Sequence, residues 1–326
     1  MTTALPRVFV TRAIAPSALT QLAQFAQVDL WPDPLPPPPA ALRDHLAMAQ
    51  GALTMVTDRL DAEVLRAAPH LRALSQMAVG TDNIDLAAAS ARNIAVGHTP
   101  GVLTETTAEL AFALLIAVAR RVVEADRHVR AGKWRSWGPD ILLGRDLYGA
   151  SLGIVGMGKI GAAMARRAHG FGMRLLYSNP APVELPQPAE FLPLSELLQR
   201  ADFISLHAPL TAATRGLIGP AQFALMKPGA ILINTARGEE IDEAALVKAL
   251  ADGHLGGAGL DVTAPEPLDA ASPLLSFPNV VITPHIGSAS VTTRRKMAEM
   301  AVDNLREGLA GRLPRWCANR AQLARA

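Results

Sequence analysis

Short apolar runs alternate with segments of helical periodicity along the first hundred residues of the chain. Residues 7–12 and 27–31 have the pattern of buried strands, and residues 17–25 between them have that of an amphipathic helix. Further strands are predicted at 51–56, 71–77 and 94–98, with helices at 61–68 and 85–92. This alternation predicts a parallel sheet that is covered by helices.

A second alternation begins at Ser151. It predicts strands at residues 151–155, 173–177, 203–207, 230–234, 257–261 and 280–283. The clearest helix between them is 242–251, and a last helix at about 290–310 precedes a polar tail. The second half of the chain is therefore predicted to form another parallel α/β sheet.

The two alternating regions are separated by a long apolar helix and an irregular segment. The helix is expected to end near Arg121, after a start signalled either by Pro100 or by the capping-box spacing of Thr106 and Glu109. Residues 124–148 are poorly periodic and contain Trp134 and Trp137. A long irregular segment is usually functional or an interface, so we expect a dimer arm.

Composition limits the classes of protein that the sequence can encode. At roughly 150 residues per domain, 326 residues predict two domains. The net charge of +2 argues against nucleic acid as the main partner. A single cysteine, Cys317, excludes a disulfide framework and a cysteine-based zinc cluster, and no metal site is expected.

Two further segments are interpreted as ordinary features of a globular chain. The proline cluster at 33–39 is interpreted as an exposed loop before a helix, although it could also be a polyproline ligand. The longest apolar stretch, 108–119, is interrupted by Glu109 and is too short to span a bilayer. The N-terminal apolar run is too short for a secretory signal, so we expect a cytoplasmic protein without a membrane partner.

A glycine-rich turn follows the strand at 151–155. Gly156, Gly158 and Gly161 have the G-x-G-x-x-G spacing, with Lys159 and Ile160 between the last two, and a helical pattern follows. The first glycine permits a tight turn, the second lets the backbone approach a pyrophosphate, and the third lets helix and strand pack closely. The strand–turn–helix context predicts a dinucleotide site.

The end of the next strand bears on the choice of cofactor. Ser178, 22 residues after Gly156, is followed by Asn179, where an acidic residue would bind the ribose 2′-hydroxyl of NAD and repel a 2′-phosphate. Its absence favours NADP(H). No Lys or Arg lies between Arg174 and Arg200 to bind a 2′-phosphate, so NAD(H) stays open.

Three charged side chains follow predicted strands beside this turn. Arg237, Glu266 and His285 each lie just beyond the carboxyl end of a strand, where open α/β sheets bind ligands. Arg can hold a carboxylate with its planar fork, His can transfer a proton near neutral pH, and Glu can orient the imidazole. His207 and Pro209 also end a strand and are candidates for the cofactor cleft.

At this point the sequence resembles the D-isomer-specific 2-hydroxyacid dehydrogenase family over nearly its whole length. The resemblance is carried by residues 79–85, 156–161, 207–211, 226–229, 234–238, 259–262 and 284–288. Within the family the chain is most similar to the glyoxylate/hydroxypyruvate reductases, through residues 102–109, 134–139 and 285–289.

The resemblance implies an α/β fold of two domains and a chain that crosses between them twice. A doubly wound, parallel-sheet (Rossmann) dinucleotide-binding domain at 100–284 would be inserted in a flavodoxin-like substrate-binding domain formed by 1–99 and 285–326. The final helix would return to the N-terminal domain. Two crossings would form a hinge whose closure assembles the site and excludes water.

The resemblance also implies roles for individual residues. Arg237 would bind the substrate carboxylate and carbonyl, and His285 would be the acid/base, with Glu266 as its partner. The other substrate-binding residues would be Leu53, the backbone N–H groups of Val79 and Gly80, Ser288, and Trp137 from the neighbouring subunit of a homodimer. The cofactor would also contact Thr214, Thr235, Asp261, His285 and Gly287.

The expected reaction is reduction of glyoxylate to glycolate and of hydroxypyruvate to D-glycerate by hydride transfer from NAD(P)H. Other reactions of this family, with larger 2-keto acids or phosphoglycerate, are the nearest alternatives. The family's formate enzymes carry Gln at the position of Glu266, which argues against formate oxidation. A protein that senses dinucleotides without catalysis, as some corepressors of this fold do, is the alternative from a different class.

Overall fold

The structure is a computed structural model that describes residues 4–323, and contacts divide the chain into two compact units. Unit 1 comprises Met1–Leu103 and Ser288–Ala326, and unit 2 comprises Thr104–Gly287. The crossings lie a few residues after the predicted positions, 99–100 and 284–285. Thr99 N–H still bonds to Ala78 in unit 1, and Gly287 N–H bonds to Asp261 in unit 2. His285 therefore belongs to unit 2.

Unit 1 contains a five-stranded parallel sheet in the order β2-β1-β3-β4-β5. The strands are β1 (Arg7–Val10), β2 (Gln27–Leu30), β3 (Gly51–Thr54), β4 (Ala73–Gln76) and β5 (Ala95–Gly97). Each lies within a predicted strand. Strands β1, β3, β4 and β5 are buried almost throughout, as expected of a parallel sheet covered on both faces, whereas the edge strand β2 buries no residue.

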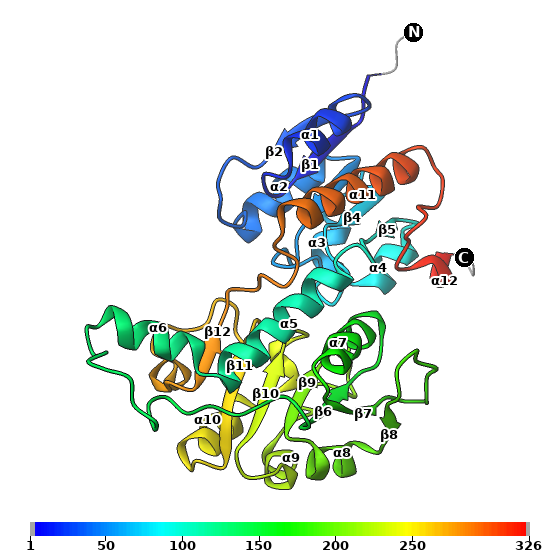
Figure 1. Ribbon diagram of the computed structural model, residues 1–326. Helices are drawn as coiled ribbons and strands as arrows, with labels where there is room; N and C mark the ends of the chain where they lie inside the picture. The colour runs from blue at the N-terminus through cyan, green and yellow to red at the C-terminus, as the bar shows by residue number, and fades with distance from the viewer. Residues whose placement is uncertain (1–3, 324–326) are drawn as a thin grey trace. The chain divides into compact units, whose positions relative to one another are not determined.

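Helices cover both faces of this sheet. The helices of unit 1 are α1 (Pro16–Ala23), α2 (Pro39–Met48), α3 (Ala62–Arg66), α4 (Leu86–Ala91), α11 (Val291–Leu309) and α12 (Arg320–Leu323). Leucines of α2 and α3 pack with Phe9 of β1 in one core cluster. On the other face α11 lies beside α1 and across β3 and β4 (Figure 1). The proline-rich residues 33–38 form a loop that leads into α2, as expected.

The segment after α11, predicted only as a polar tail, is held to unit 1 by Asn319. This side chain is fully buried. It accepts from Val96 N–H at 3.0 Å and donates to Ile94 carbonyl and Ser90 hydroxyl, both at 2.9 Å. The hydropathy pattern misses this contact because a single buried amide has the sequence signature of a surface residue.

Unit 2 contains a seven-stranded parallel sheet in the order β12-β11-β10-β9-β6-β7-β8. The strands are β6 (Ser151–Val155), β7 (Arg174–Ser178), β8 (Glu190–Phe191), β9 (Phe203–Leu206), β10 (Ala230–Asn234), β11 (Leu255–Leu260) and β12 (Val280–Ile282). The strand order reverses at β6, which pairs with β7 on one side and β9 on the other. This is a doubly wound sheet with its switch point at the end of β6.

Two apolar clusters fill the two faces of this sheet. The helices of unit 2 are α5 (Thr104–Ala119), α6 (Val122–Arg130), α7 (Lys159–Gly170), α8 (Leu194–Arg200), α9 (Pro220–Leu225) and α10 (Glu243–Ala251), with short 3₁₀ turns at Gly238–Glu240 and Pro273–Ser276. Side chains of α5 and α7 form one cluster with the strands, and those of α8, α9 and α10 form the other. The prediction of an α/β fold with two parallel sheets is confirmed.

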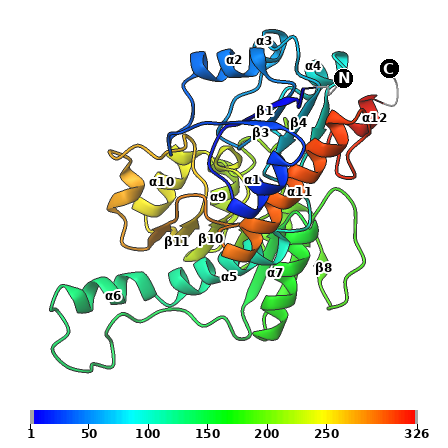
Figure 2. The same ribbon diagram turned by 90° about the horizontal axis from the view of Figure 1, so that it is seen from above.

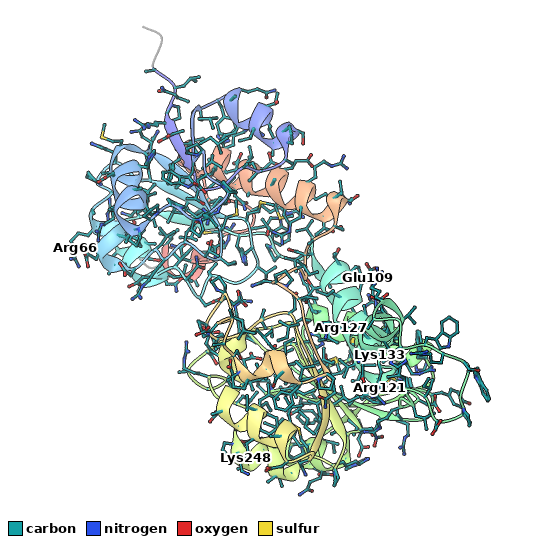
Figure 3. All side chains as sticks on the ribbon, turned by 90° about the vertical axis from the view of Figure 1, so that its left-hand side faces the viewer. Arg66, Glu109, Arg121, Arg127, Lys133 and Lys248 are labelled. Carbon is teal, nitrogen blue, oxygen red and sulfur yellow. The ribbon has the colours of Figure 1, made fainter. Side chains whose placement is uncertain are left out.

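Part of the segment predicted to be irregular is helical. Within residues 124–148, the portion up to Arg130 belongs to α6, which buries none of its side chains. Ion pairs of Arg121 with Glu124 and of Arg130 with Asp126 support the helix in place of core packing. In Figures 1 and 2, helix α6 and the residues that follow it in the sequence stand away from the sheet of unit 2. Figure 3 labels Arg127 and Lys133 on this part of the chain.

None of the described helices combines the length and the apolar character that a membrane crossing requires.

Candidate active site

The glycine-rich turn lies at the switch point of the unit 2 sheet. Gly156 has φ 92°, a left-handed conformation that glycine adopts without the steric cost of a Cβ. A Cβ there would lie 2.6 Å from the nitrogen of Ala208, in the segment after β9. A Cβ on Gly161 would lie 2.2 Å from the Gly156 carbonyl oxygen. The turn therefore requires glycine at both positions.

The start of α7 fits the pyrophosphate of a dinucleotide. Gly158 is the N-cap of α7, so no side chain caps the first N–H groups of the helix. A Cβ built on Gly158 would meet nothing within 4 Å, which shows open space in front of the helix N-terminus. Lys159 is exposed and Ile160 is half-buried beside this space. The backbone donors and the positive end of the helix dipole can therefore hold phosphate oxygens.

Asn179 connects the end of β7 to the glycine-rich turn. Its Oδ1 accepts a hydrogen bond from Met157 N–H at 3.2 Å, and its Nδ2 donates to the Ala181 carbonyl at 2.9 Å. Ser178 contacts the same turn through its backbone, because its carbonyl accepts from Gly156 N–H at 2.9 Å. The side chain that reaches the phosphate-binding turn is therefore that of Asn179.

The segment after β9 forms the other side of the switch point. His207 N–H donates to the Val155 carbonyl at 2.8 Å, and its Nε2 lies 2.9 Å from the hydroxyl of Ser205. Burial lowers the pKa of His207 to about 4, so the imidazole is neutral near pH 7. The Thr214 hydroxyl donates to the Pro209 carbonyl at 2.6 Å and thereby fixes the turn that follows.

Arg237 follows β10 in a turn that a buried amide holds. The Asn234 side chain is fully buried and donates to the Arg237 carbonyl at 2.7 Å, while its Oδ1 accepts from Ala236 N–H at 2.9 Å. The hydroxyl of Thr235 is buried there without a hydrogen-bond partner, as expected of a group that awaits a ligand. One nitrogen of the Arg237 guanidinium donates to the Ala236 carbonyl at 2.7 Å.

The turns after β10 and β11 are in direct contact. A Cβ built on Gly238 would lie 2.1 Å from the carbonyl carbon of Thr263, so only glycine allows this approach. Thr263 N–H in turn donates to Oε1 of Glu266 at 3.2 Å. The backbone beside Arg237 therefore abuts the segment that carries Glu266.

Glu266 and His285 form a hydrogen-bonded pair. Oε2 of Glu266 lies 2.8 Å from Nδ1 of His285, and both side chains are about one-third exposed. A carboxylate on Nδ1 fixes the ring orientation and leaves Nε2 to exchange a proton with a ligand. The structure thus brings together the two residues that the sequence predicted as an acid/base and its partner, next to the Arg237 turn.

Asp261 holds the turn that carries His285. Its carboxylate accepts from Ile286 N–H at 2.8 Å, Gly287 N–H at 2.7 Å and Thr283 hydroxyl at 2.6 Å. Burial raises the pKa of Asp261, and these hydrogen bonds offset part of that rise. His285 has φ 54°, in the left-handed region that costs a non-glycine residue about 1–3 kcal/mol, so the surrounding contacts hold it there. The sequence did not predict this positioning role of Asp261.

In unit 1, Val79 and Gly80 lie in a loop after β4 whose peptide groups are held in place. The Gly80 carbonyl accepts from the Gln76 amide at 2.9 Å, and the Val79 carbonyl lies 3.0 Å from Nδ1 of His98. Asn83 contacts the Gln76 side chain and donates to the Asp58 carbonyl at 2.7 Å. These contacts make the loop a fixed backbone element.

The remaining predicted substrate residues differ in exposure. Leu53 of β3 is fully buried, whereas Ser288 is half-buried. Trp134 and Trp137 lie in the segment that follows α6 in the sequence, and they are 63% and 80% exposed. Two exposed indoles on one projecting segment are typical of an interface.

Comparison with known proteins identifies the family of this chain. Residues 112–287 match the family model for the NAD binding domain of D-isomer specific 2-hydroxyacid dehydrogenases. A glyoxylate reductase of Korarchaeum cryptofilum is 51% identical over 313 residues, covering 95% of this chain and 94% of that protein. The chain belongs to the D-isomer specific 2-hydroxyacid dehydrogenase family.

Solved structures agree with this assignment. The TT0316 protein of Thermus thermophilus is 51% identical, with a TM-score of 0.90 over 96% of this chain and 99% of that one. An NADPH-dependent glyoxylate/hydroxypyruvate reductase of Sinorhizobium meliloti, solved with NADP and malonate, is 32% identical, with a TM-score of 0.86 over 98% of each chain. The resemblance proposed from the sequence motifs is confirmed.

Proposed function

We propose that this protein is a glyoxylate/hydroxypyruvate reductase that reduces small 2-keto acids with NAD(P)H. The observation that carries the proposal is the His285–Glu266 pair at 2.8 Å, beside the Arg237 turn and on the sheet edge that bears the glycine-rich turn. The names of relatives that are up to 51% identical over nearly the whole chain support the substrate class.

The residues of unit 2 divide the chemistry between them. A nicotinamide cofactor, held by the glycine-rich turn and the start of α7, would supply the hydride for the keto carbon. Protonated His285 donates its Nε2 proton to the keto oxygen, while Glu266 holds the ring through Nδ1. Arg237 stabilises the negative charge that develops on that oxygen and binds the adjacent carboxylate. The products are glycolate from glyoxylate and D-glycerate from hydroxypyruvate.

For the rest of the substrate site we propose the backbone N–H groups of Val79 and Gly80 as ligands of the carboxylate, with Leu53 and Ser288 beside the substrate. Support for the first comes from the fixed peptide groups of that loop. We also propose a homodimer in which Trp137 reaches the partner's site, supported by its exposure on the projecting segment. A cytoplasmic location remains a prediction.

We propose NADP(H) as the preferred cofactor. No carboxylate stands at the end of β7 to repel a 2′-phosphate, and a related reductase was solved with NADP. Asn179, with its side chain on the glycine-rich turn, is the position that we expect to sense the ribose substituent.

Asn179→Asp is expected to shift the preference toward NADH. The new carboxylate would accept from the ribose 2′-hydroxyl and repel a 2′-phosphate at the same place. We expect the ratio of kcat/KM for NADPH to that for NADH to fall by about tenfold or more, since one charged contact is worth roughly 1.5–3 kcal/mol. Ser178→Asp is the matched comparison. An unchanged ratio in both variants would exclude this strand end from cofactor selection.

The reaction is tested by following oxidation of NADPH and NADH by absorbance, with glyoxylate, hydroxypyruvate and pyruvate as a panel. We expect glyoxylate and hydroxypyruvate to be reduced with higher kcat/KM than pyruvate. No oxidation with any keto acid, together with tight dinucleotide binding, would reject the proposal in favour of a sensing protein. Turnover confined to larger keto acids would keep the family and change the substrate.

A further inference from the structure

Glu240 is a fully buried acidic residue three positions after Arg237. Its side chain has no exposed surface, and neither carboxylate oxygen has a hydrogen-bond partner. Most buried carboxyl groups in proteins are paired or hydrogen-bonded, because an isolated buried charge is costly. A carboxyl group in this position is therefore kept neutral unless a nearby positive charge compensates it.

The backbone holds Glu240 in one place relative to Arg237. Arg237 is the N-cap of the 3₁₀ turn after β10 and Glu240 is its last residue, and Glu240 N–H donates to the Arg237 carbonyl at 3.3 Å. The Glu240 carbonyl accepts from Ile218 N–H at 2.9 Å, and the same Arg237 carbonyl accepts from the buried Asn234 amide. Glu240 cannot move to solvent without breaking this turn.

The charged groups around Glu240 come from its own turn and from the segments beside it. Arg237 and Glu239 in the turn are the two whose charges act on it. The segments in contact with the turn also carry Arg215 before Gly216, Asp242 and Glu243 at the start of α10, and Glu266 after Thr263. Asp242 caps α10 through Ala245 N–H, and Glu243 accepts from Ser272. Burial, opposed by Arg237 and assisted by Glu239, raises the pKa of Glu240 to about 8.

We propose that Glu240 is a positioning residue for Arg237: its neutral form leaves the guanidinium charge available to an anionic substrate, and its ionised form neutralises that charge and releases the substrate. The inference rests on the proposed function, because it takes Arg237 as the ligand of the keto-acid carboxylate. Glu240 touches neither substrate nor cofactor and acts through the electrostatic field at Arg237 alone.

The expected signature is a rise of KM in mildly alkaline solution. Between pH 7 and pH 9 Glu240 loses its proton, which adds a negative charge to the Arg237 turn. At the dielectric constant typical of a partly solvated site, this charge weakens binding of a carboxylate by roughly tenfold. The KM for glyoxylate should therefore rise by about five- to tenfold over this range, at constant ionic strength and saturating cofactor.

Glu240→Gln tests this assignment, because it keeps the volume and removes the titration. The variant should show a flat KM from pH 7 to pH 9. Glu239→Gln, the same change on the half-buried neighbour, is the control: it should keep a rise in KM, moved toward lower pH because Glu239 no longer helps to raise the pKa of Glu240. A wild-type KM that is flat over this range, a rise that persists in Glu240→Gln, or a rise abolished by Glu239→Gln would each overturn the proposal. Glu240→Met replaces Glu240→Gln if the amide fails to fold.

Stability supplies a readout that does not depend on activity. A folded-state pKa of about 8, above the ordinary value of 4.5, means that the folded state binds the proton more tightly than the unfolded one. The free energy of unfolding of the wild type, measured with urea, should fall as pH rises from 5 to 8. In Glu240→Gln this fall should be smaller by the part that Glu240 contributes. If the wild type loses stability between pH 5 and pH 8 through Glu240 but reduces no keto acid, the proposed function fails. If the protein reduces keto acids but Glu240→Gln has the same pH dependence of stability as the wild type, the role of Glu240 fails.

Discussion

Replacement of His285 with alanine is expected to lower kcat for glyoxylate reduction by about 10²-fold or more, which is the scale of general acid catalysis. The variant loses the group that donates the proton to the keto oxygen. It keeps the Asp261 contacts to Ile286 and Gly287 N–H, because those are made by the backbone. KM and cofactor affinity should therefore change much less than kcat.

Glu266→Gln provides the graded comparison for this prediction. The amide can still contact Nδ1 of His285, but it carries no charge to stabilise the imidazolium. Its kcat should fall between those of the wild type and His285→Ala. Stopped-flow measurement of a single turnover separates the chemical step from product release. Near wild-type turnover in His285→Ala would remove this residue from the mechanism.

Replacement of Arg237 with lysine should lower kcat/KM for glyoxylate by roughly 10- to 100-fold. Lysine keeps the positive charge but cannot present two parallel donors to a carboxylate. Loss of one charged hydrogen bond costs about 1.5–3 kcal/mol, which corresponds to that range. Because Asn234 holds the backbone of this turn, the change should leave the fold intact.

Arg174→Lys is the control for Arg237→Lys. Arg174 is exposed at the start of β7, so its replacement is the same chemical change at the opposite end of the strands from the proposed substrate ligands. Steady-state kinetics and urea unfolding should be measured on both variants. Equal kcat/KM in Arg237→Lys and Arg174→Lys would show that the guanidinium of Arg237 makes no contact that matters for the reaction.

Much of this fold can be predicted from the sequence because most of its strands are buried on both faces, although the edge strands β2 and β8 are not. Runs such as 151–155 and 230–234 are apolar almost throughout and match the observed strands. The candidate catalytic residues could also be predicted from the sequence, because parallel strands place the residues that follow them at one edge of the sheet. Arg237, Glu266 and His285 follow three neighbouring strands, β10, β11 and β12.

The groups that support the site could not be predicted in the same way. Asp261 organises the His285 turn through backbone donors, and Asn234 does so for Arg237, but neither contact leaves a periodic signal in the sequence. Helix α6 escaped prediction for a different reason. Val122, Ala125 and Val129 have helical spacing, but the helix is only nine residues long and Val122 lies before the segment that was expected to be irregular.

The central claim is tested most directly by the stereochemistry of the product. The purified protein should be incubated with hydroxypyruvate and excess NADPH, and the glycerate formed should be resolved by chiral chromatography. Hydride addition to one face of the keto carbon would give a single enantiomer, and membership of the D-isomer specific family predicts that it is D-glycerate. Formation of L-glycerate or of a racemic mixture, or recovery of unreacted hydroxypyruvate, would contradict the account.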